Sequence, residues 1–106
     1  MSTERDPNGF DQHEPGAKLD AGKAPVSQGL LSYFPRALLE VAKVSGHGAE
    51  NYTWGGWLQV PNGERRYRDA MGRHILEGHI TEYDQKSRML HMAHVAWNSL
   101  AVLELM

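Results

Sequence analysis

The sequence predicts an all-α fold, a three-helix core bundle with an irregular N-terminal segment and a Trp/Gly-rich loop between the first two helices. Three observations predict it. Apolar residues recur at helical spacing in three stretches, alternating strand patterns are weak, and Gly and Pro gather between those stretches. A chain of 106 residues is also short enough for one domain with a modest core.

The N-terminal part lacks any periodic pattern. Residues 1–16 are rich in Asp, Glu, Gly, Pro and Asn, so we expect a flexible arm there and a single helical domain over 17–106. The next stretch, "GAKLDAGKAPVSQGLLSYFP", reads as an extended loop around Lys18, Asp20 and Lys23. Those two lysines are either exposed to solvent or placed to hold an anion.

The first helix is expected to begin at Pro35, because proline is favoured in a first helical turn. The glycines Gly46 and Gly48 are expected to end or bend it. The stretch "NYTWGGWLQVPNG" then suggests a short hairpin-like excursion, and the second helix is expected to start near Glu64. Its apolar side carries Tyr67, Ala70, Met71, His74 and Ile75.

The third helix is expected to start after an N-cap at Ser87 and to run to the C-terminus. It is apolar nearly all round, which is typical of the central helix of a bundle. His91, His94 and Asn98 nevertheless share one stripe of it. Burying such groups without partners costs about 1–3 kcal/mol each. Either they form a satisfied structural network, or they line a pocket beside a metal ion or a phosphate.

Composition excludes several classes of protein. The chain has no cysteine, so disulfides, thiolate zinc sites and thiol catalysis are excluded. No apolar run approaches the roughly 18 residues of a membrane span, and no secretory signal is visible, so an intracellular location is expected. A net charge of −2 without a basic stripe argues against duplex nucleic acid as a partner. The HExxH, Walker and GxSxG motifs are absent as well.

Carboxylates on the first two helices are candidate metal ligands. Glu40 and Asp69 would form a site if they faced each other, since bundles hold Mg²⁺ or Mn²⁺ with inward carboxylates. Otherwise Glu40 and Asp69 lie on solvent-exposed helix faces. In that case Asp69, Arg73 and Glu77, which are spaced four residues apart, form a series of surface ion pairs along the second helix. Trp54 and Trp57 either pack their loop or stack on a nucleobase.

Four stretches together, "GAKLDAGKAP", "ALLEVAKVSGHGAENY", "GGWLQVPNGERRYRDAMGRH" and "MLHMAHVAWNSLAVLEL", resemble the dATP/dGTP diphosphohydrolase family of phages and prophages. That family is related to the MazG-like all-α nucleotide pyrophosphohydrolases. The resemblance covers nearly all of residues 16–106. It implies hydrolysis of a deoxynucleoside triphosphate, with purines favoured, to the monophosphate and pyrophosphate using Mg²⁺ or Mn²⁺. It also implies a homo-oligomer.

The resemblance implies roles for particular residues. MazG-like enzymes hold metal with ExxE and ExxD pairs, and the matching segments here, 40–43 and 66–69, keep only Glu40 and Asp69. These two would be metal ligands, with Glu50 as a third. Any further ligands would come from Glu77, Glu82, Asp84 or the histidines. The other implied roles are phosphate binding by Lys18, Lys23 and Arg73, base contact by Trp54 or Trp57, and catalytic or water-orienting support by Asp69, Asp84, His91, His94 and Asn98.

Two alternatives from other classes stay open. Because the ExxE and ExxD pairs are incomplete, the chain could be a nucleotide-binding protein without catalysis. Because the third helix is so apolar, the chain could instead be a structural helical oligomer.

Overall fold

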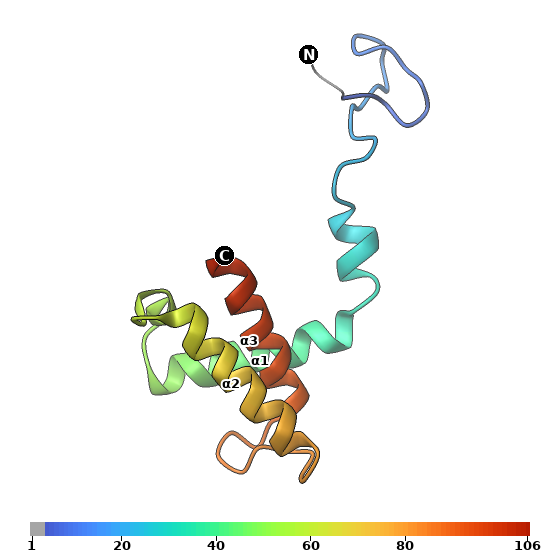
Figure 1. The fold of residues 1–106 in the computed structure, drawn as a ribbon. Helices are drawn as coiled ribbons and strands as arrows, with labels where there is room; N and C mark the ends of the chain where they lie inside the picture. The colour runs from blue at the N-terminus through green and yellow to red at the C-terminus, as the bar shows by residue number, and fades with distance from the viewer. Residues whose placement is uncertain (1–3) are drawn as a thin grey trace. The chain divides into compact units, whose positions relative to one another are not determined.

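The computed structural model describes residues 4–106, which fall into two compact units, one ending at Tyr33 and one spanning Phe34–Met106. The second unit holds the three main helices, α1 (Pro35–Asn51), α2 (Gly63–Gly78) and α3 (His91–Leu105) (Figure 1). Over residues 4–106 strand pairing is limited to one isolated bridge, between Tyr83 and Leu90. The predicted all-α, bundle-like fold is therefore confirmed.

The first unit is organised around the carboxylate of Asp6. This carboxylate accepts hydrogen bonds from the backbone N–H groups of Asn8 (2.7 Å), Phe10 (3.4 Å) and Lys18 (2.7 Å). The N–H of Ala21 also donates to the carbonyl of Arg5. A short π-helix, η1 (Ser27–Leu31), follows. The flexibility predicted for residues 1–16 stays a prediction, and residues 1–3 lie outside the described part.

The helix α1 begins at Pro35 as predicted but continues through Gly46 and Gly48 to Asn51, so the expectation that these glycines end it is wrong. Each glycine costs a helix about 1 kcal/mol relative to alanine. Tertiary contacts offset this cost, because Val44 is buried and the Oγ of Ser45 accepts a 2.8 Å hydrogen bond from the indole of Trp97.

The Trp/Gly-rich loop is present, but it is not a hairpin. It forms a 3₁₀ turn, η2 (Gly56–Gln59), after Gly55 in the left-handed region at φ 75°. The ring of Trp57 packs edge-on against Tyr67 and Trp97, with centroids 6.0 and 5.6 Å away. The hydroxyl of Tyr67 donates to the carbonyl of Trp57 at 2.7 Å. Burial of one aromatic ring therefore shapes this loop.

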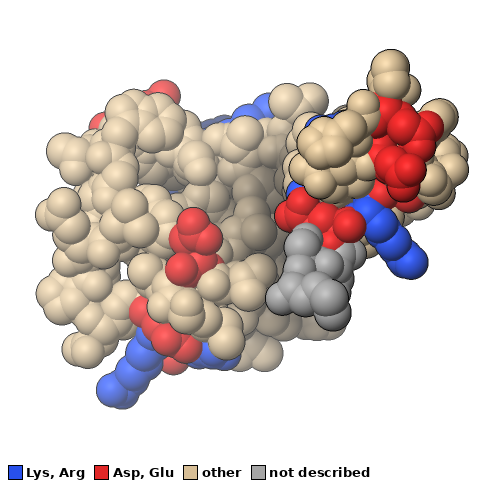
Figure 2. Space-filling view, turned by 90° about the horizontal axis from the view of Figure 1, so that it is seen from above, with Lys and Arg blue, Asp and Glu red and all other residues tan. Residues whose placement is uncertain are grey.

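The helix α3 packs against both α2 and α1, which confirms its predicted central place (Figure 1). The small core of the unit contains Val44, Ala93, Ala101 and Val102. Much of the apolar surface of α3 stays uncovered, and Figure 2 shows a face of the molecule on which uncharged side chains predominate. The large apolar side chains exposed on α3 are Met92, Leu100 and Leu103.

The connection from α2 to α3 corrects the predicted start of the third helix. Leu90, not Ser87, stands at the N-cap position of α3. Ser87 belongs to a tight turn, where its N–H donates to the carboxylate of Asp84 at 2.7 Å. The N–H of His91 donates to the carbonyl of Glu82. Within residues 4–106, no helix is long and apolar enough to cross a membrane.

Candidate metal centre

Four potential metal ligands converge where α2 ends and α3 begins. They are His74 and Glu77 of α2, Asp84 of the connecting turn, and His91 of α3. One ligand atom from each lies within 4.8 Å of all the others. Two imidazoles and two carboxylates form a donor set that is compatible with a divalent metal ion.

Local structure explains why these residues meet. His74 and Glu77 are three residues apart on α2 and therefore project from the same side of the helix. Gly78 lets the end of α2 approach α3, because a Cβ built there would lie 3.3 Å from the Cβ of His91. The bond from the His91 N–H to the Glu82 carbonyl closes the turn that carries Asp84.

His91 is the most deeply buried of the four residues, with only 3% of its surface exposed. Its Nδ1 lies 2.9 Å from the Nδ1 of His74 and 3.8 Å from a carboxylate oxygen of Glu77. In a hydrogen bond between two imidazole nitrogens, one must donate and the other accept. One of the two Nδ1 atoms therefore carries the hydrogen, and the other presents its lone pair to it.

A second layer of contacts holds the cluster in place. The ring of His94 stacks on that of His74, with centroids 4.3 Å apart and planes 6° from parallel. The Nε2 of His94 shares a 2.7 Å hydrogen bond with the Oγ of Ser87. Buried Asn98 donates to the backbone carbonyl of His94 at 2.8 Å. His94 and Asn98 thus support the centre from behind.

Burial favours the neutral forms of His74 and His94, while hydrogen bonding favours the ionised form of Asp84. Burial lowers the pKa of His74 and of His94, although the nearby charge of Asp84 opposes this shift in both. Burial pushes the pKa of Asp84 upward, but the hydrogen bonds from Ser87 and the electrostatic influence of His94 and His74 outweigh burial, so this pKa lies below its usual value. Metal ligation requires these same protonation states.

The cluster opens into a pocket of about 460 Å³. Two cationic side chains, Arg73 and Lys86, line this pocket together with all four donors. The walls are completed by Ile80, Thr81 and Gln85. Cationic side chains and potential metal ligands therefore border one space.

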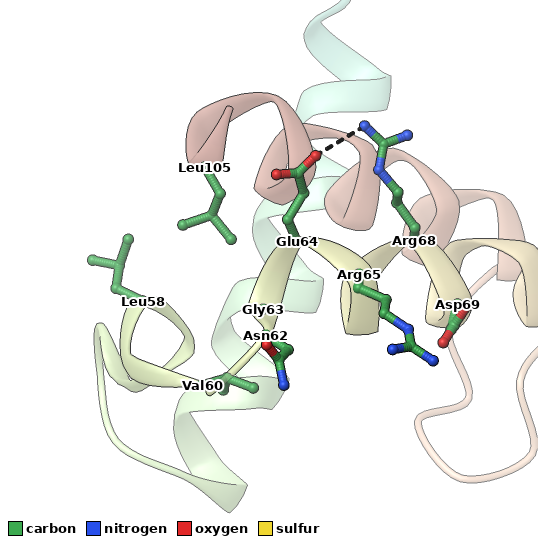
Figure 3. Close-up of a pocket in the computed structure, with 9 residues that line it drawn as sticks. All are labelled: Leu58, Val60, Asn62, Gly63, Glu64, Arg65, Arg68, Asp69 and Leu105. Carbon is green, nitrogen blue, oxygen red and sulfur yellow. Dashed lines mark hydrogen bonds and ion pairs between the residues drawn. The ribbon is translucent and has the colours of Figure 1, made fainter.

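The structure places the predicted metal ligands elsewhere. Glu40 pairs with Lys43 on α1 at 2.8 Å, and Glu50 is exposed near the end of the same helix. Asp69 borders a second pocket, of about 570 Å³, at the start of α2. In Figure 3, Arg65 and Asp69 project to one side of α2 and the Glu64–Arg68 pair to the other. Among the described residues, these three carboxylates join no cluster of donors, and their roles as ligands stay predictions.

The predicted substrate-binding residues also differ in their settings. Lys18 and Lys23 belong to the first unit, where Lys23 pairs with Glu4 at 3.4 Å. Trp54 is 78% exposed, whereas Trp57 packs against Tyr67 and Trp97. Of the two interpretations of the tryptophans, packing holds for Trp57, and Trp54 is free to contact a ligand.

Sequence reasoning treated some members of the cluster differently. The helical pattern placed His74 on the apolar side of its helix and Glu77 in a surface ladder. The family resemblance is the available signal for both, since it implies Glu77, Asp84 or the histidines as substitutes for the missing carboxylates. Ser87, predicted as a helix cap, lies in the turn beside Asp84 instead. His47 of α1, whose charge acts on His94, was not singled out.

Comparison with known protein families places this chain in a family whose name denotes nucleotide hydrolysis. The chain belongs to the family described as dATP/dGTP diphosphohydrolase, N-terminal, whose profile matches residues 13–106. The predicted resemblance is thus confirmed at the level of the family. No curated protein and no solved structure matches the chain.

Proposed function

We propose that this chain hydrolyses deoxynucleoside triphosphates, with purines favoured, to the monophosphate and pyrophosphate in a divalent-metal-dependent reaction. Membership of a diphosphohydrolase family supports the proposal. The observation that carries it is the meeting of four metal donors and two cationic side chains, Arg73 and Lys86, in one pocket. A triphosphate needs both kinds of group.

Each group in the pocket has a task in such a reaction. His74, Glu77, Asp84 and His91 would hold the metal ion, which supplies Lewis-acid polarisation and neutralises phosphate charge. Arg73 would grip phosphate oxygens in a bidentate manner, and Lys86 would add a point charge. Water then attacks the α-phosphorus while the bond to the bridging oxygen breaks, and pyrophosphate leaves. Asp84 would both hold the ion and orient that water.

The base is proposed to contact Trp54. Its ring is exposed and therefore available for stacking, whereas the ring of Trp57 is engaged with two other aromatic rings. Lys18 and Lys23 are proposed as further phosphate partners on the strength of the resemblance alone. Mg²⁺ and Mn²⁺ are the ions proposed from the resemblance.

A second candidate is nucleotide binding without turnover. The polar groups of α3 are all engaged, because His91 contacts His74, His94 contacts Ser87, and Asn98 contacts the backbone. Over residues 4–106 every buried side-chain nitrogen and oxygen has a hydrogen-bond partner. A satisfied network of this kind would be stable without an ion, so it favours this alternative specifically.

Self-association is also proposed. The unit Phe34–Met106 buries only small apolar side chains and Val, while Met92, Leu100 and Leu103 of α3 are 50–70% exposed. Contiguous exposed apolar surface on a small protein commonly marks an interface. A second copy of the chain would cover it without any other partner being required.

One experiment tests the catalytic proposal. Each dNTP is incubated with the full chain and Mn²⁺ or Mg²⁺, and the nucleotides are then separated chromatographically. Formation of a monophosphate together with pyrophosphate is expected, fastest with dATP or dGTP. If the folded chain binds a dNTP in equilibrium dialysis but releases no monophosphate, the proposal is wrong and nucleotide binding alone replaces it.

A further inference from the structure

We propose that the centre formed by His74, Glu77, Asp84 and His91 selects a first-row transition ion, in the order Mn²⁺, Co²⁺, Zn²⁺ of rising affinity, over Mg²⁺. This inference deepens the proposed function by naming the class of metal ion. Only the catalytic use of the ion rests on the proposed function. The binding claim itself concerns the donors alone.

The kinds of donor carry the first step. Mg²⁺ takes oxygen ligands and keeps several waters, whereas imidazole suits the later divalent ions. Half of the donors here are imidazoles, from His74 and His91. Mg²⁺ would be coordinated only by the carboxylates of Glu77 and Asp84, and neither imidazole would be a favourable ligand for it.

The geometry carries the second step. The two Nδ1 atoms are already 2.9 Å apart. This is close to the roughly 3 Å between adjacent nitrogen ligands of one ion, given metal–nitrogen bonds of about 2.1 Å. The ring of His91 is buried, so its donor atom is held inside the cluster and does not sample solvent. Little rearrangement is needed for both rings to bind one ion.

The surrounding contacts carry the third step. Metal ligands in proteins are usually oriented by a second set of hydrogen bonds. Here the N–H of Ser87 binds the carboxylate of Asp84, and the Oγ of Ser87 binds His94, whose ring stacks on His74. One serine thus links the carboxylate donor to the imidazole donor from behind. Ser87 and His94 are positioning residues in this account.

Charge agrees with a divalent occupant. The cluster brings together two carboxyl groups, those of Glu77 and Asp84, and one divalent ion would offset their negative charge. Arg73 and Lys86 lie along the same pocket, where they would repel a free cation but hold the anion that follows it. We therefore expect one ion per chain.

The test uses the metal alone, without nucleotide. Metal-free full chain is titrated with Mn²⁺, and the electron paramagnetic resonance signal of free Mn²⁺ reports binding. Competition with Mg²⁺, Co²⁺ and Zn²⁺ then ranks the ions. We expect one site, with Mg²⁺ at least about tenfold weaker than Mn²⁺ and Zn²⁺ the tightest. Equal or tighter binding of Mg²⁺, or no site at all, would overturn the inference.

Variants locate the site. Asp84→Asn and His91→Gln should abolish Mn²⁺ binding, and Ser87→Ala should weaken it by about 10–100-fold. Exposed Glu104→Gln and His79→Gln are matched controls that should bind as the parent does. Because His91→Gln could unfold the chain, circular dichroism accompanies each variant, and His74→Gln provides a second imidazole deletion. Retained binding in folded Asp84→Asn and His74→Gln overturns the assignment.

The two proposals fail separately. Tight Mn²⁺ binding without dNTP hydrolysis leaves the metal centre in place and removes the enzymatic function. Hydrolysis that needs Mg²⁺, with no preference for a transition ion, leaves the function in place and removes this inference.

Discussion

The Nδ1 atoms of His74 and His91 lie 2.9 Å apart, although α2 and α3 are separated by a twelve-residue connection, residues 79–90. A contact between two such groups requires a hydrogen shared between them or a cation that both can bind. The account above rests on the second possibility, because Glu77 and Asp84 bring negative charge to the same place.

The close approach of α2 and α3 should depend on Gly78. In Gly78→Ala the new Cβ would meet the Cβ of His91 at 3.3 Å, so the helices must separate slightly and Mn²⁺ should bind more weakly. Gly72→Ala is the matched control, since nothing lies within 4 Å of its new methyl group. It should raise the free energy of unfolding by about 0.5–1 kcal/mol, measured by urea denaturation. An equal gain from Gly78→Ala with unchanged Mn²⁺ affinity would contradict this.

The hydroxyl of Tyr67 should stabilise the Trp-containing loop. Burial raises the pKa of this phenol, with Arg66 opposing, and its hydroxyl donates to the Trp57 carbonyl at 2.7 Å. Tyr67→Phe should lower the free energy of unfolding by about 1 kcal/mol. Tyr52→Phe, at a position 81% exposed, should leave it unchanged. Equal stability of the two variants in urea would count against a structural role for this bond.

The turn around Asp6 should open at acidic pH. The bond from the Lys18 N–H is the main cause that lowers the pKa of this carboxyl, and bonds from Asn8, Phe10 and Gly9 add to it, while burial opposes. The carboxylate is covered by its own turn (7% exposed) and not by a surrounding interior, so hydrogen bonding prevails over desolvation.

Because the folded pKa lies below the unfolded value of 3.8, this stabilisation is present above that value and is lost as the pH falls through the folded pKa. Amide hydrogen exchange at Asn8 and Lys18 should accelerate there, relative to the intrinsic rate, and in Asp6→Asn already at neutral pH. Asp20→Asn, at an exposed position, is the control. Protection in Asp6→Asn that matches the parent would rule this explanation out.

The exposed ring of Trp54 should matter for substrate and not for stability. Trp54→Ala should raise the KM for purine dNTPs several-fold, while the free energy of unfolding changes by less than about 0.5 kcal/mol. Trp57→Ala should instead lower that free energy by roughly 2–4 kcal/mol, since its ring packs on Tyr67 and Trp97. Steady-state kinetics and urea denaturation separate the two effects. An unchanged KM in Trp54→Ala would remove the proposed base contact.

The three helices could be predicted because their apolar periodicity is long and regular. The start of α1 at Pro35 could be predicted too, but the end of α1 and the start of α3 could not, because they depend on tertiary contacts. The packing of Val44 and the Trp97–Ser45 bond hold α1 together through two glycines. Ser87, a good N-cap by residue type, is used by Asp84 and His94 instead.

The candidate centre was only partly visible in the sequence for a similar reason. The stripe of His91, His94 and Asn98 follows from helical spacing and was recognised. The partners of His91, namely His74 and Glu77, come from another helix, and sequence spacing does not reveal how two helices rotate toward each other. The carboxylate pattern and the family resemblance both point to Glu40 and Asp69 instead.

The central claim is that turnover depends on the cluster where α2 and α3 meet. It is tested most directly by measuring kcat for dGTP hydrolysis with Mn²⁺ in Asp84→Asn and in Asp69→Asn. The parent protein and Glu104→Gln serve as references. The account predicts a loss of at least about 100-fold in Asp84→Asn and nearly parental turnover in Asp69→Asn. Parental turnover in a folded Asp84→Asn, with activity lost in Asp69→Asn, would contradict it and place the chemistry at the start of α2.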